Sequence, residues 1–278
     1  MIPAAFDYLR PGVLEEAVGL LAKHGADARV LAGGHSLLPA MKLGLAQPKV
    51  LVDLGRIAEL RAIREADGWI AIGAMATHDD IESSDLLKRA CPLLPEVAGR
   101  IGDWQVRNRG TIGGSLAHAD PAADWPAPIL ALEAELEAVG PGGRRTIAAK
   151  NFFVDLFQTA LRPGEILRSV RVPVTAKSVA YQKFAQKASG FAICGVAAVI
   201  EPNAARVAIT GVGFRAYRAS AVESRLRGKL SAAAIASAAE QAARGVEPLA
   251  DLHASAEYRA HLARVLTRRA LERALSRN

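Results

Sequence analysis

The stretch QVRNRGTIGGSLAHADPAAD, residues 105–124, holds a Gly-Gly step between Thr111 and Ser115. A second stretch of the same kind, LAGGHSLLP, occupies residues 31–39. Glycine has no Cβ, so the backbone N–H groups of such a loop can approach and surround an anion. Hydroxyl side chains beside the glycines add further donors. Two loops of this kind can hold opposite sides of one diphosphate, which points to a dinucleotide ligand.

The more familiar nucleotide motifs are absent. No Gly-Lys-Ser/Thr ending follows either glycine pair, which excludes a phosphate loop of that type. The stretch GVGFRA at 211–216 approaches the G-x-G-x-x-G/A fingerprint. That fingerprint requires a helix directly after it and an acidic residue about twenty positions further on, where this chain has Ser231. We interpret the stretch as a strand end followed by a tight turn.

Composition limits the class of protein. The chain has 278 residues, of which 51% are hydrophobic, enough for two domains with sizeable cores. Lys and Arg number 35 against 28 acidic residues, a net charge of +7. The cations near the C-terminus indicate either a solvated helical face or a face that meets an acidic partner subunit: Arg264, Arg268, Arg269, Arg273 and Arg277. Aromatic residues make up only 5%, which argues against a nucleic-acid stacking platform.

The cysteines and the N-terminus suggest a compartment. Cys91 and Cys194 lie far apart with no Cys-x-x-Cys spacing, so they cannot by themselves hold an iron–sulfur cluster or a structural zinc. They suit a reducing cytoplasm, although two cysteines can still pair. No basic leader precedes an apolar stretch at the N-terminus, and no run reaches the ~20 apolar residues of a membrane-spanning helix. We therefore expect a cytoplasmic protein.

Hydrophobic periodicity predicts alternating helices and strands in the first part of the chain. The pattern favours helices at 13–24, 37–45 and 86–99, the last interrupted by Pro92 and Pro95, with Thr77 as the cap of a further helix. It favours strands at 28–32, 50–54, 69–74, 129–137 and 166–172. After a boundary at 173–177 it predicts three strands, at 179–187, 191–200 and 205–213, followed by helices at 219–227, 231–244 and 255–275.

The two glycine stretches, in this order and separation, resemble the FAD-binding medium subunit of the molybdenum hydroxylases, the family of aerobic carbon monoxide dehydrogenase and the xanthine dehydrogenases. The resemblance covers the whole chain, including AGGHSLLPAMKL at 32–43, residues 73–78 and the PGEIL stretch at 163–167. It implies an α+β fold with a two-subdomain FAD-binding domain of the vanillyl-alcohol-oxidase type at 1–176, divided into about 1–56 and 57–176. A small C-terminal α+β domain of three antiparallel strands and helices would follow at 177–278.

The resemblance also implies the site. Residues 32–36 and 111–115 would surround the FAD diphosphate, Leu31 and Leu37 would pack near the flavin or its ribityl chain, and Asp124 would bond a ribose or ribityl hydroxyl. Lys187 can reach the flavin or be a solvated lysine at a strand end. The cofactor-binding residues expected are Leu31, Ala32, Gly33, Gly34, His35, Ser36, Leu37, Gly110, Thr111, Gly113, Gly114, Ser115, His118, Asp124, Ile166, Leu167 and Lys187.

The sequence departs from the family pattern at two positions. Gly44 stands where many relatives carry Arg, and Gly190 stands where many carry Asp before an aromatic residue. Neither lies in the two glycine stretches.

Other chemistries fit the residues less well. His118, Asp120 and Asp124 are spaced closely enough for a metal site, but capping of backbone N–H groups explains them better. Neither Ser36 nor Ser115 lies in a G-x-S-x-G elbow, so nucleophilic catalysis is rejected. His35 has no orienting carboxylate nearby in the sequence that would make it a general base. No catalytic residue and no metal ligand are therefore assigned.

Three functions follow as hypotheses. The first is an electron-transfer subunit carrying non-covalent FAD. In this hypothesis the [2Fe-2S] clusters would lie on a small partner subunit and the molybdenum cofactor on a large one. The assembly would be a dimer of heterotrimers that passes electrons to an external acceptor. The second is a self-contained flavin oxidoreductase acting on a small organic substrate, which needs an acid or base that the sequence does not offer. The third is a non-catalytic nucleotide-binding protein.

Overall fold

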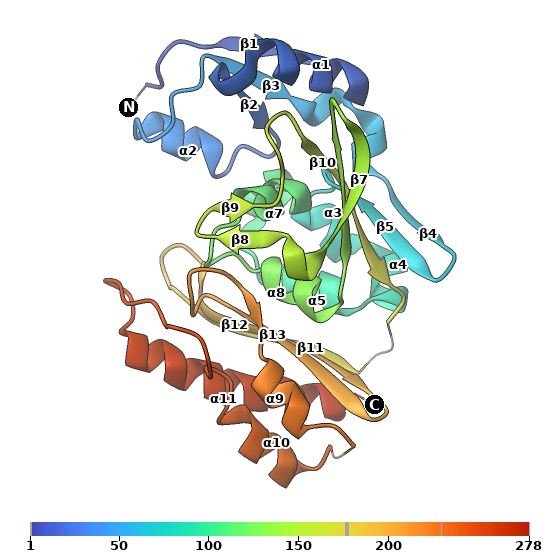
Figure 1. Ribbon diagram of the computed structural model, residues 1–278, viewed down its shortest axis with the longest axis vertical. Helices are drawn as coiled ribbons and strands as arrows, with labels where there is room; N and C mark the ends of the chain where they lie inside the picture. Colours follow the sequence, from blue (N-terminus) through green and yellow to red (C-terminus); the bar gives the residue numbers. More distant parts are fainter. Residues whose placement is uncertain (1, 176–177, 229, 278) are drawn as a thin grey trace.

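The computed structural model describes residues 2–175, 178–228 and 230–277. Three β-sheets form successive layers along the long axis of the molecule (Figure 1). The first layer is a parallel sheet in the order β1-β3-β2. Its elements are β1 (Asp7–Leu9), α1 (Leu14–His24), β2 (Ala28–Leu31), α2 (Leu37–Lys42) and β3 (Val50–Asp53). Helix α1 buries its apolar stripe against this sheet and ends at Gly25, whose φ of 52° suits a residue without a Cβ.

The middle layer is an antiparallel sheet in the order β4-β5-β10-β6-β7, with short helices packed on one face. Its strands are β4 (Ile63–Ala66), β5 (Trp69–Gly73), β6 (Glu135–Gly140), β7 (Gly143–Ala148) and β10 (Ile166–Pro173). The helices are α3 (His78–Ser83), α4 (Asp85–Ala90), α5 (Leu93–Ala98), α6 (Trp104–Arg109), α7 (Ile112–His118) and α8 (Pro126–Ala131). A small hairpin, β8 (Phe153–Asp155) and β9 (Gln158–Thr159), lies beside α7.

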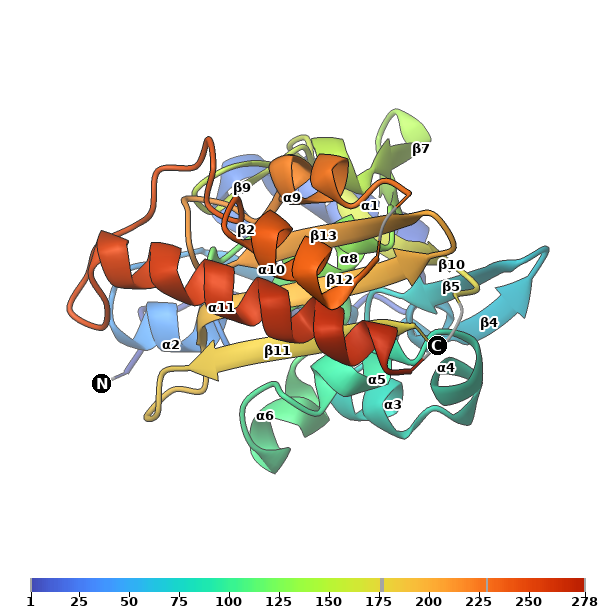
Figure 2. The same cartoon turned by 90° about the horizontal axis from the view of Figure 1, so that it is seen from below.

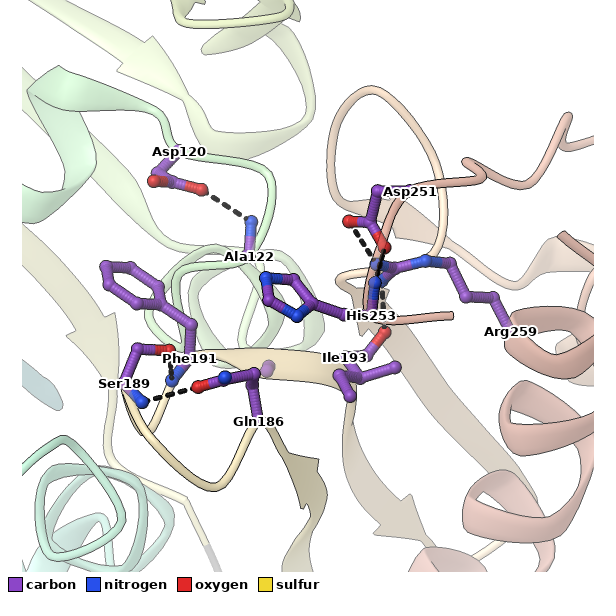
Figure 3. A pocket seen from close by; sticks show the side chains of 10 residues that line it. Asp120, Ala122, Gln186, Ser189, Phe191, Ile193, Asp251, His253 and Arg259 are labelled. Atoms are coloured by element: carbon purple, nitrogen blue, oxygen red, sulfur yellow. Dashed lines mark hydrogen bonds and ion pairs between the residues drawn. The ribbon is translucent and has the colours of Figure 1, made fainter. Parts of the chain in front are cut away.

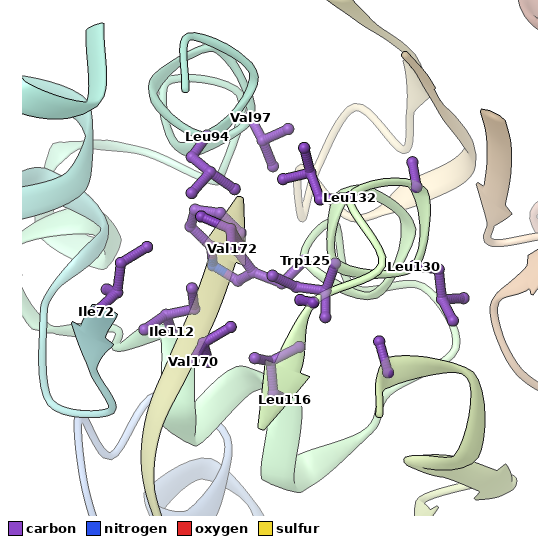
Figure 4. Packing of buried hydrophobic residues seen from close by; sticks show 14 of the residues in the cluster. Ile72, Leu94, Val97, Ile112, Leu116, Trp125, Leu130, Leu132, Val170 and Val172 are labelled. Carbon is purple, nitrogen blue, oxygen red and sulfur yellow. The ribbon is translucent and has the colours of Figure 1, made fainter. Parts of the chain in front are cut away.

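Trp125 occupies the centre of the core between these helices and the sheet. Figure 4 shows it among Ile112 and Leu116 of α7, Val170 and Val172 of β10, and side chains of α5. Its indole is fully buried. Ile112 and Leu116 of α7 are therefore held by packing onto the sheet. This packing fixes the position of the second glycine stretch.

The C-terminal layer is an antiparallel sheet in the order β11-β12-β13-β14, covered on its outer face by helices (Figure 2). Its elements are β11 (Val179–Ala185), β12 (Ala192–Glu201), β13 (Ala204–Thr210), β14 (Tyr217–Arg218), α9 (Ser220–Arg225), α10 (Ala232–Ala239) and α11 (Ala256–Leu275). Strand β12 is buried on both faces because α8 covers one side and α11 the other. That position explains its nearly unbroken apolar sequence.

Most predicted elements are confirmed, and the exceptions have local causes. The strand predicted at 129–137 is wrong in its first half. Pro126 begins helix α8, whose six residues are all buried, and the strand starts only at Glu135. Proline at the first helical turn costs no hydrogen bond, so an apolar run after it forms a helix as readily as a strand. Pro95 likewise lies inside α5 without breaking it. The C-terminal sheet has a fourth, short strand, β14, that the sequence analysis did not predict.

Within the described ranges, four of the five C-terminal arginines have carboxylate partners, and one of these, Arg264, lies 3.9 Å from Glu240. Arg273 and Arg277 both contact the carboxylate of Glu96 on α5, which ties the end of α11 to the middle layer. Arg268 pairs with Glu272 one turn away, as a solvated helical face does. Among the described residues, no helix is long and apolar enough to cross a membrane.

Candidate functional site

The two glycine stretches meet in the folded protein. The first connects the end of β2 to the start of α2, and the second connects α6 to α7. The Cα of Gly33 lies so close to the second stretch that a Cβ there would overlap the carbonyl oxygen of Arg109 and approach the Cα of Gly110 to 2.8 Å. At Gly114, a Cβ would lie 3.3 Å from the Cβ of Ala32. Residues far apart in sequence thus form one junction.

The first stretch keeps its backbone donors free. Within the described residues, the N–H groups of Gly33, Gly34, His35 and Ser36 have no acceptor, while the carbonyls of Gly34 and Ser36 receive N–H groups of α2. Gly34 has a φ of 82°, a conformation that favours glycine. His35 and Ser36 are exposed. A row of unpaired N–H groups at a junction of glycines fits an anion such as a diphosphate.

The second stretch uses most of its backbone donors internally. Residues from Ile112 onward form helix α7 rather than the predicted loop, with Thr111 as its cap. The N–H groups of Ile112 and Gly113 donate to the carbonyls of Ala76 and Ala74 at 3.1 and 2.9 Å, and Gly114 N–H donates to Thr111 Oγ1 at 3.1 Å. Thr111 N–H has no acceptor among the described residues, so this stretch offers a ligand that N–H group and the hydroxyls of Thr111 and Ser115.

Asp124 joins the middle layer to the C-terminal layer. Its Oδ2 lies 2.8 Å from Lys183 Nζ, and its Oδ1 accepts a hydrogen bond of 2.6 Å from the Tyr181 hydroxyl. The Asp124 and Lys183 side chains are only 5% and 4% exposed. Burial raises the pKa of Asp124, and the contacts with Lys183 and Tyr181 oppose that rise. Burial also raises the pKa of Tyr181 well above its usual value, which keeps it a neutral donor.

Sequence reasoning missed Tyr181 and Lys183. They lie on β11 with one residue between them, so they share the face of the strand that starts at buried Val179. The two-residue spacing of the tyrosine and the lysine was the available signal, since buried and exposed residues do not alternate along β11. Lys187, chosen instead, is exposed in the turn after β11 and has no ion pair among the described residues.

The remaining predicted residues lie at various depths. Ile166 and Leu167 begin β10, with both side chains buried in apolar cores, so only their backbone groups can face a ligand. Leu31 and Leu37 are half-buried on either side of the first stretch. His118, at the end of α7, is exposed, and its ring lies 5.1 Å from that of Phe157.

The three residues considered for a metal point to different partners. Asp120 accepts a hydrogen bond of 2.8 Å from Ala122 N–H, Asp124 contacts Lys183, and His118 packs on Phe157. The described part of the chain contains no group of three or more His, Cys, Asp or Glu side chains able to hold a metal ion. Cys91 and Cys194 are buried as free thiols.

A small cavity lies beside the turn between β11 and β12. Figure 3 shows it between Phe191, Asp120 and the segment carrying Asp251 and His253. Its volume of about 190 Å³ is too small for a dinucleotide. Gly190, which precedes Phe191, and Gly44, which follows α2, both have a φ of 74°. Glycine is thus favoured locally at both positions where the sequence departs from the family pattern.

Comparisons with known proteins agree with this geometry. Residues 4–175 match the family described as FAD binding domain in molybdopterin dehydrogenase, and residues 179–274 match the CO dehydrogenase flavoprotein C-terminal domain. The chain is 43% identical to the carbon monoxide dehydrogenase medium chain of Hydrogenophaga pseudoflava, with 100% of this chain and 99% of that one aligned. It is 38% identical to the 6-hydroxypseudooxynicotine dehydrogenase complex subunit alpha of Paenarthrobacter nicotinovorans, over 100% and 97% of the two chains.

The fold agrees as closely. The structure superimposes with a TM-score of 0.96 on a chain of the H. pseudoflava carbon monoxide dehydrogenase that lacks the Mo-pyranopterin moiety of its cofactor, at 44% identity over 100% and 99% of the two chains. The chain belongs to the FAD-binding medium subunits of the molybdopterin dehydrogenase family, and so to a class of oxidoreductase subunits.

Proposed function

We propose that this chain binds FAD non-covalently at the junction of the two glycine stretches and carries electrons within a molybdenum-containing hydroxylase or dehydrogenase. The observation that carries the proposal is the row of unpaired N–H groups at 33–36, held against Arg109 and Gly110 by a contact that only glycine permits. Donors of this kind suit the diphosphate of a dinucleotide.

The other predicted residues take supporting roles in this proposal. Thr111 and Ser115 donate hydroxyls from the opposite side of the diphosphate, and Leu31 and Leu37 pack against the ribityl side of the cofactor. Each carboxylate oxygen of Asp124 can accept a second hydrogen bond beside those from Lys183 and Tyr181. Asp124 can therefore also accept a hydrogen bond from a hydroxyl of the ribose or ribityl chain. The backbone of Ile166 and Leu167 lines the adenine side, and His118 and Lys187 lie at the edges of the site.

When bound, the flavin supplies the redox chemistry, and the residues of this chain bind it, orient it and tune its surroundings. We propose that electrons come from iron–sulfur clusters on a small partner subunit, which receives them from a molybdenum site on a large one. The relatives named above are a medium chain and a complex subunit. The two enzymes named act on unrelated compounds, which fits a substrate site that lies on a partner chain.

We further propose two folding units, at 1–176 and 177–278, the first divided near residue 56, and a dimer of heterotrimers working in the cytoplasm. The buried contact between Asp124 and Lys183 crosses the boundary between the two units. Dimers related by a two-fold axis are the commonest symmetric assembly.

Two measurements test the proposal. Acid precipitation of the purified chain, reconstituted with FAD, should release FAD into the supernatant, whereas flavin in the pellet would indicate a covalent link. Size-exclusion chromatography after co-expression with a two-cluster iron–sulfur chain and a molybdenum chain should give one three-subunit peak. Elution of this chain alone, or turnover of an organic substrate by it alone, would favour the self-contained oxidoreductase.

A further inference from the structure

His78 packs against Gly110, at the junction of the two glycine stretches. It is the first residue of α3 and is 4% exposed. Its backbone N–H donates to the carbonyl of Gly110 at 2.9 Å. Its imidazole packs on the same residue, since a Cβ at Gly110 would lie 2.7 Å from His78 Nε2. The ring thus touches the glycine against which Gly33 rests.

A neighbouring tryptophan fixes the protonation of this ring. Trp125 Nε1 lies 3.1 Å from His78 Nδ1 in a buried hydrogen bond. The indole nitrogen can only donate, so Nδ1 is the acceptor and the imidazole proton is on Nε2. Burial lowers the pKa of His78 to about 3, with smaller contributions from His35 and Arg107. At neutral pH the ring is therefore uncharged and carries one donor of fixed direction.

That donor has no partner in the described part of the chain. No oxygen or nitrogen accepts from Nε2–H. Several side-chain nitrogen and oxygen atoms of the protein are buried and lack a hydrogen-bond partner, but His78 Nε2 does not belong to that group. The small exposed part of His78 therefore includes this nitrogen.

We propose that His78 is a further ligand of the FAD diphosphate, donating from Nε2–H to a phosphate oxygen where Gly33 and Gly110 meet. This inference rests on the proposed function, because it assumes that FAD occupies the junction. A neutral donor with a fixed tautomer adds a directed hydrogen bond to the free N–H groups of residues 33–36. Trp125 is then a positioning residue that acts through His78.

Substitution tests the donor. His78→Leu should weaken FAD binding tenfold or more in fluorescence titration, whereas His78→Gln, which keeps a neutral side-chain N–H donor, should stay within threefold of the wild type. Trp125→Phe, which removes the hydrogen bond to Nδ1, should give an intermediate loss. Equal FAD affinity of folded His78→Leu and wild type would overturn the proposal.

A measurement on the unsubstituted chain is independent of how the variants fold. With ¹⁵N-labelled histidine, the Nε2–H resonance of His78 should move downfield when FAD is added, and the FAD ³¹P resonances should differ between wild type and His78→Gln. A purely structural role would move neither in this way. Wild-type protein that binds FAD with an unmoved Nε2–H resonance overturns this inference alone, whereas wild-type protein that binds no FAD overturns the proposed function as well.

Discussion

The two glycine stretches look alike in sequence and offer different groups in the folded protein. Among the described residues, the first presents free N–H groups at 33–36, whereas the second spends the N–H groups of its helix start, Ile112 to Gly114, on the carbonyls of Ala76 and Ala74 and on its own cap. The first therefore contributes backbone donors and the second a rigid support with hydroxyls. Similar composition does not imply similar use, because the neighbours of a glycine decide whether its N–H stays available.

The contrast predicts that Gly33→Ala has the largest effect on flavin binding. The new Cβ would overlap the Arg109 carbonyl, which is backbone and cannot swing aside. FAD binding should be lost, and the free energy of unfolding should fall by about 1–3 kcal/mol or more. FAD content and urea denaturation measure the two effects. Gly19→Ala, where a Cβ meets nothing within 4 Å, is the control and should keep normal FAD content.

Gly114→Val should abolish flavin binding while the chain stays folded. Its side chain would start 2.8 Å from Thr111 Oγ1 and 3.3 Å from the Ala32 Cβ, in the space between the two stretches. Gly113→Ala provides the contrast, because its Cβ would overlap Ala74 in the core and should destabilise the fold itself. Thermal unfolding and flavin absorbance separate the two outcomes. Near-normal flavin in Gly114→Val would show that the diphosphate lies elsewhere.

Asp124→Ala should have a smaller effect on flavin and a clear effect on the fold. Loss of one charged hydrogen bond should weaken FAD binding by about 1.5–3 kcal/mol. Leaving Lys183 buried without its partner should lower the free energy of unfolding by about 3–5 kcal/mol. The double variant Asp124→Leu with Lys183→Met is the matched control and should regain most of that stability. Urea denaturation that finds the single variant as stable as wild type would contradict the role given to this pair.

The smallest effect is expected at Arg145, away from both glycine stretches. Its guanidinium contacts both carboxylate oxygens of Glu165 at 2.7 Å, and these hydrogen bonds hold the pKa of Glu165 below its usual value. A lowered pKa in the folded state means that the stabilisation is present above the unfolded-state pKa of about 4.3 and is lost as pH falls through the folded-state value.

Arg145→Met should therefore cost about 1–2 kcal/mol of unfolding free energy at neutral pH and less in strong acid, where only the hydrogen bond from Arg145 to the Ala160 carbonyl is lost. Urea denaturation across this pH range measures the difference. Arg144→Met, at the exposed neighbouring position, should behave as wild type throughout. A stability loss that does not depend on pH would assign the effect to packing and to the hydrogen bond with the Ala160 carbonyl instead of the Glu165 pair.

Much of this protein was predictable because its signals are local. Helix α1 with its terminal glycine, the strands on either side of the first glycine stretch, and the cap Thr77 all follow from periodicity and capping chemistry. The start of α8 was missed since an apolar run after Pro126 suits either a helix or a strand, and only its burial between two layers decides.

The sequence by itself determined the class of protein, because two glycine stretches occur in a fixed order. It also determined that no cysteines are spaced for an iron–sulfur cluster. Only the tertiary structure decided which N–H groups remain free and that Asp124 meets Lys183 and Tyr181. It also brought His78 beneath Gly110. The physical reason is that glycine spacing and hydroxyl type belong to the chain, whereas a donor becomes available or satisfied through neighbours that are distant in sequence.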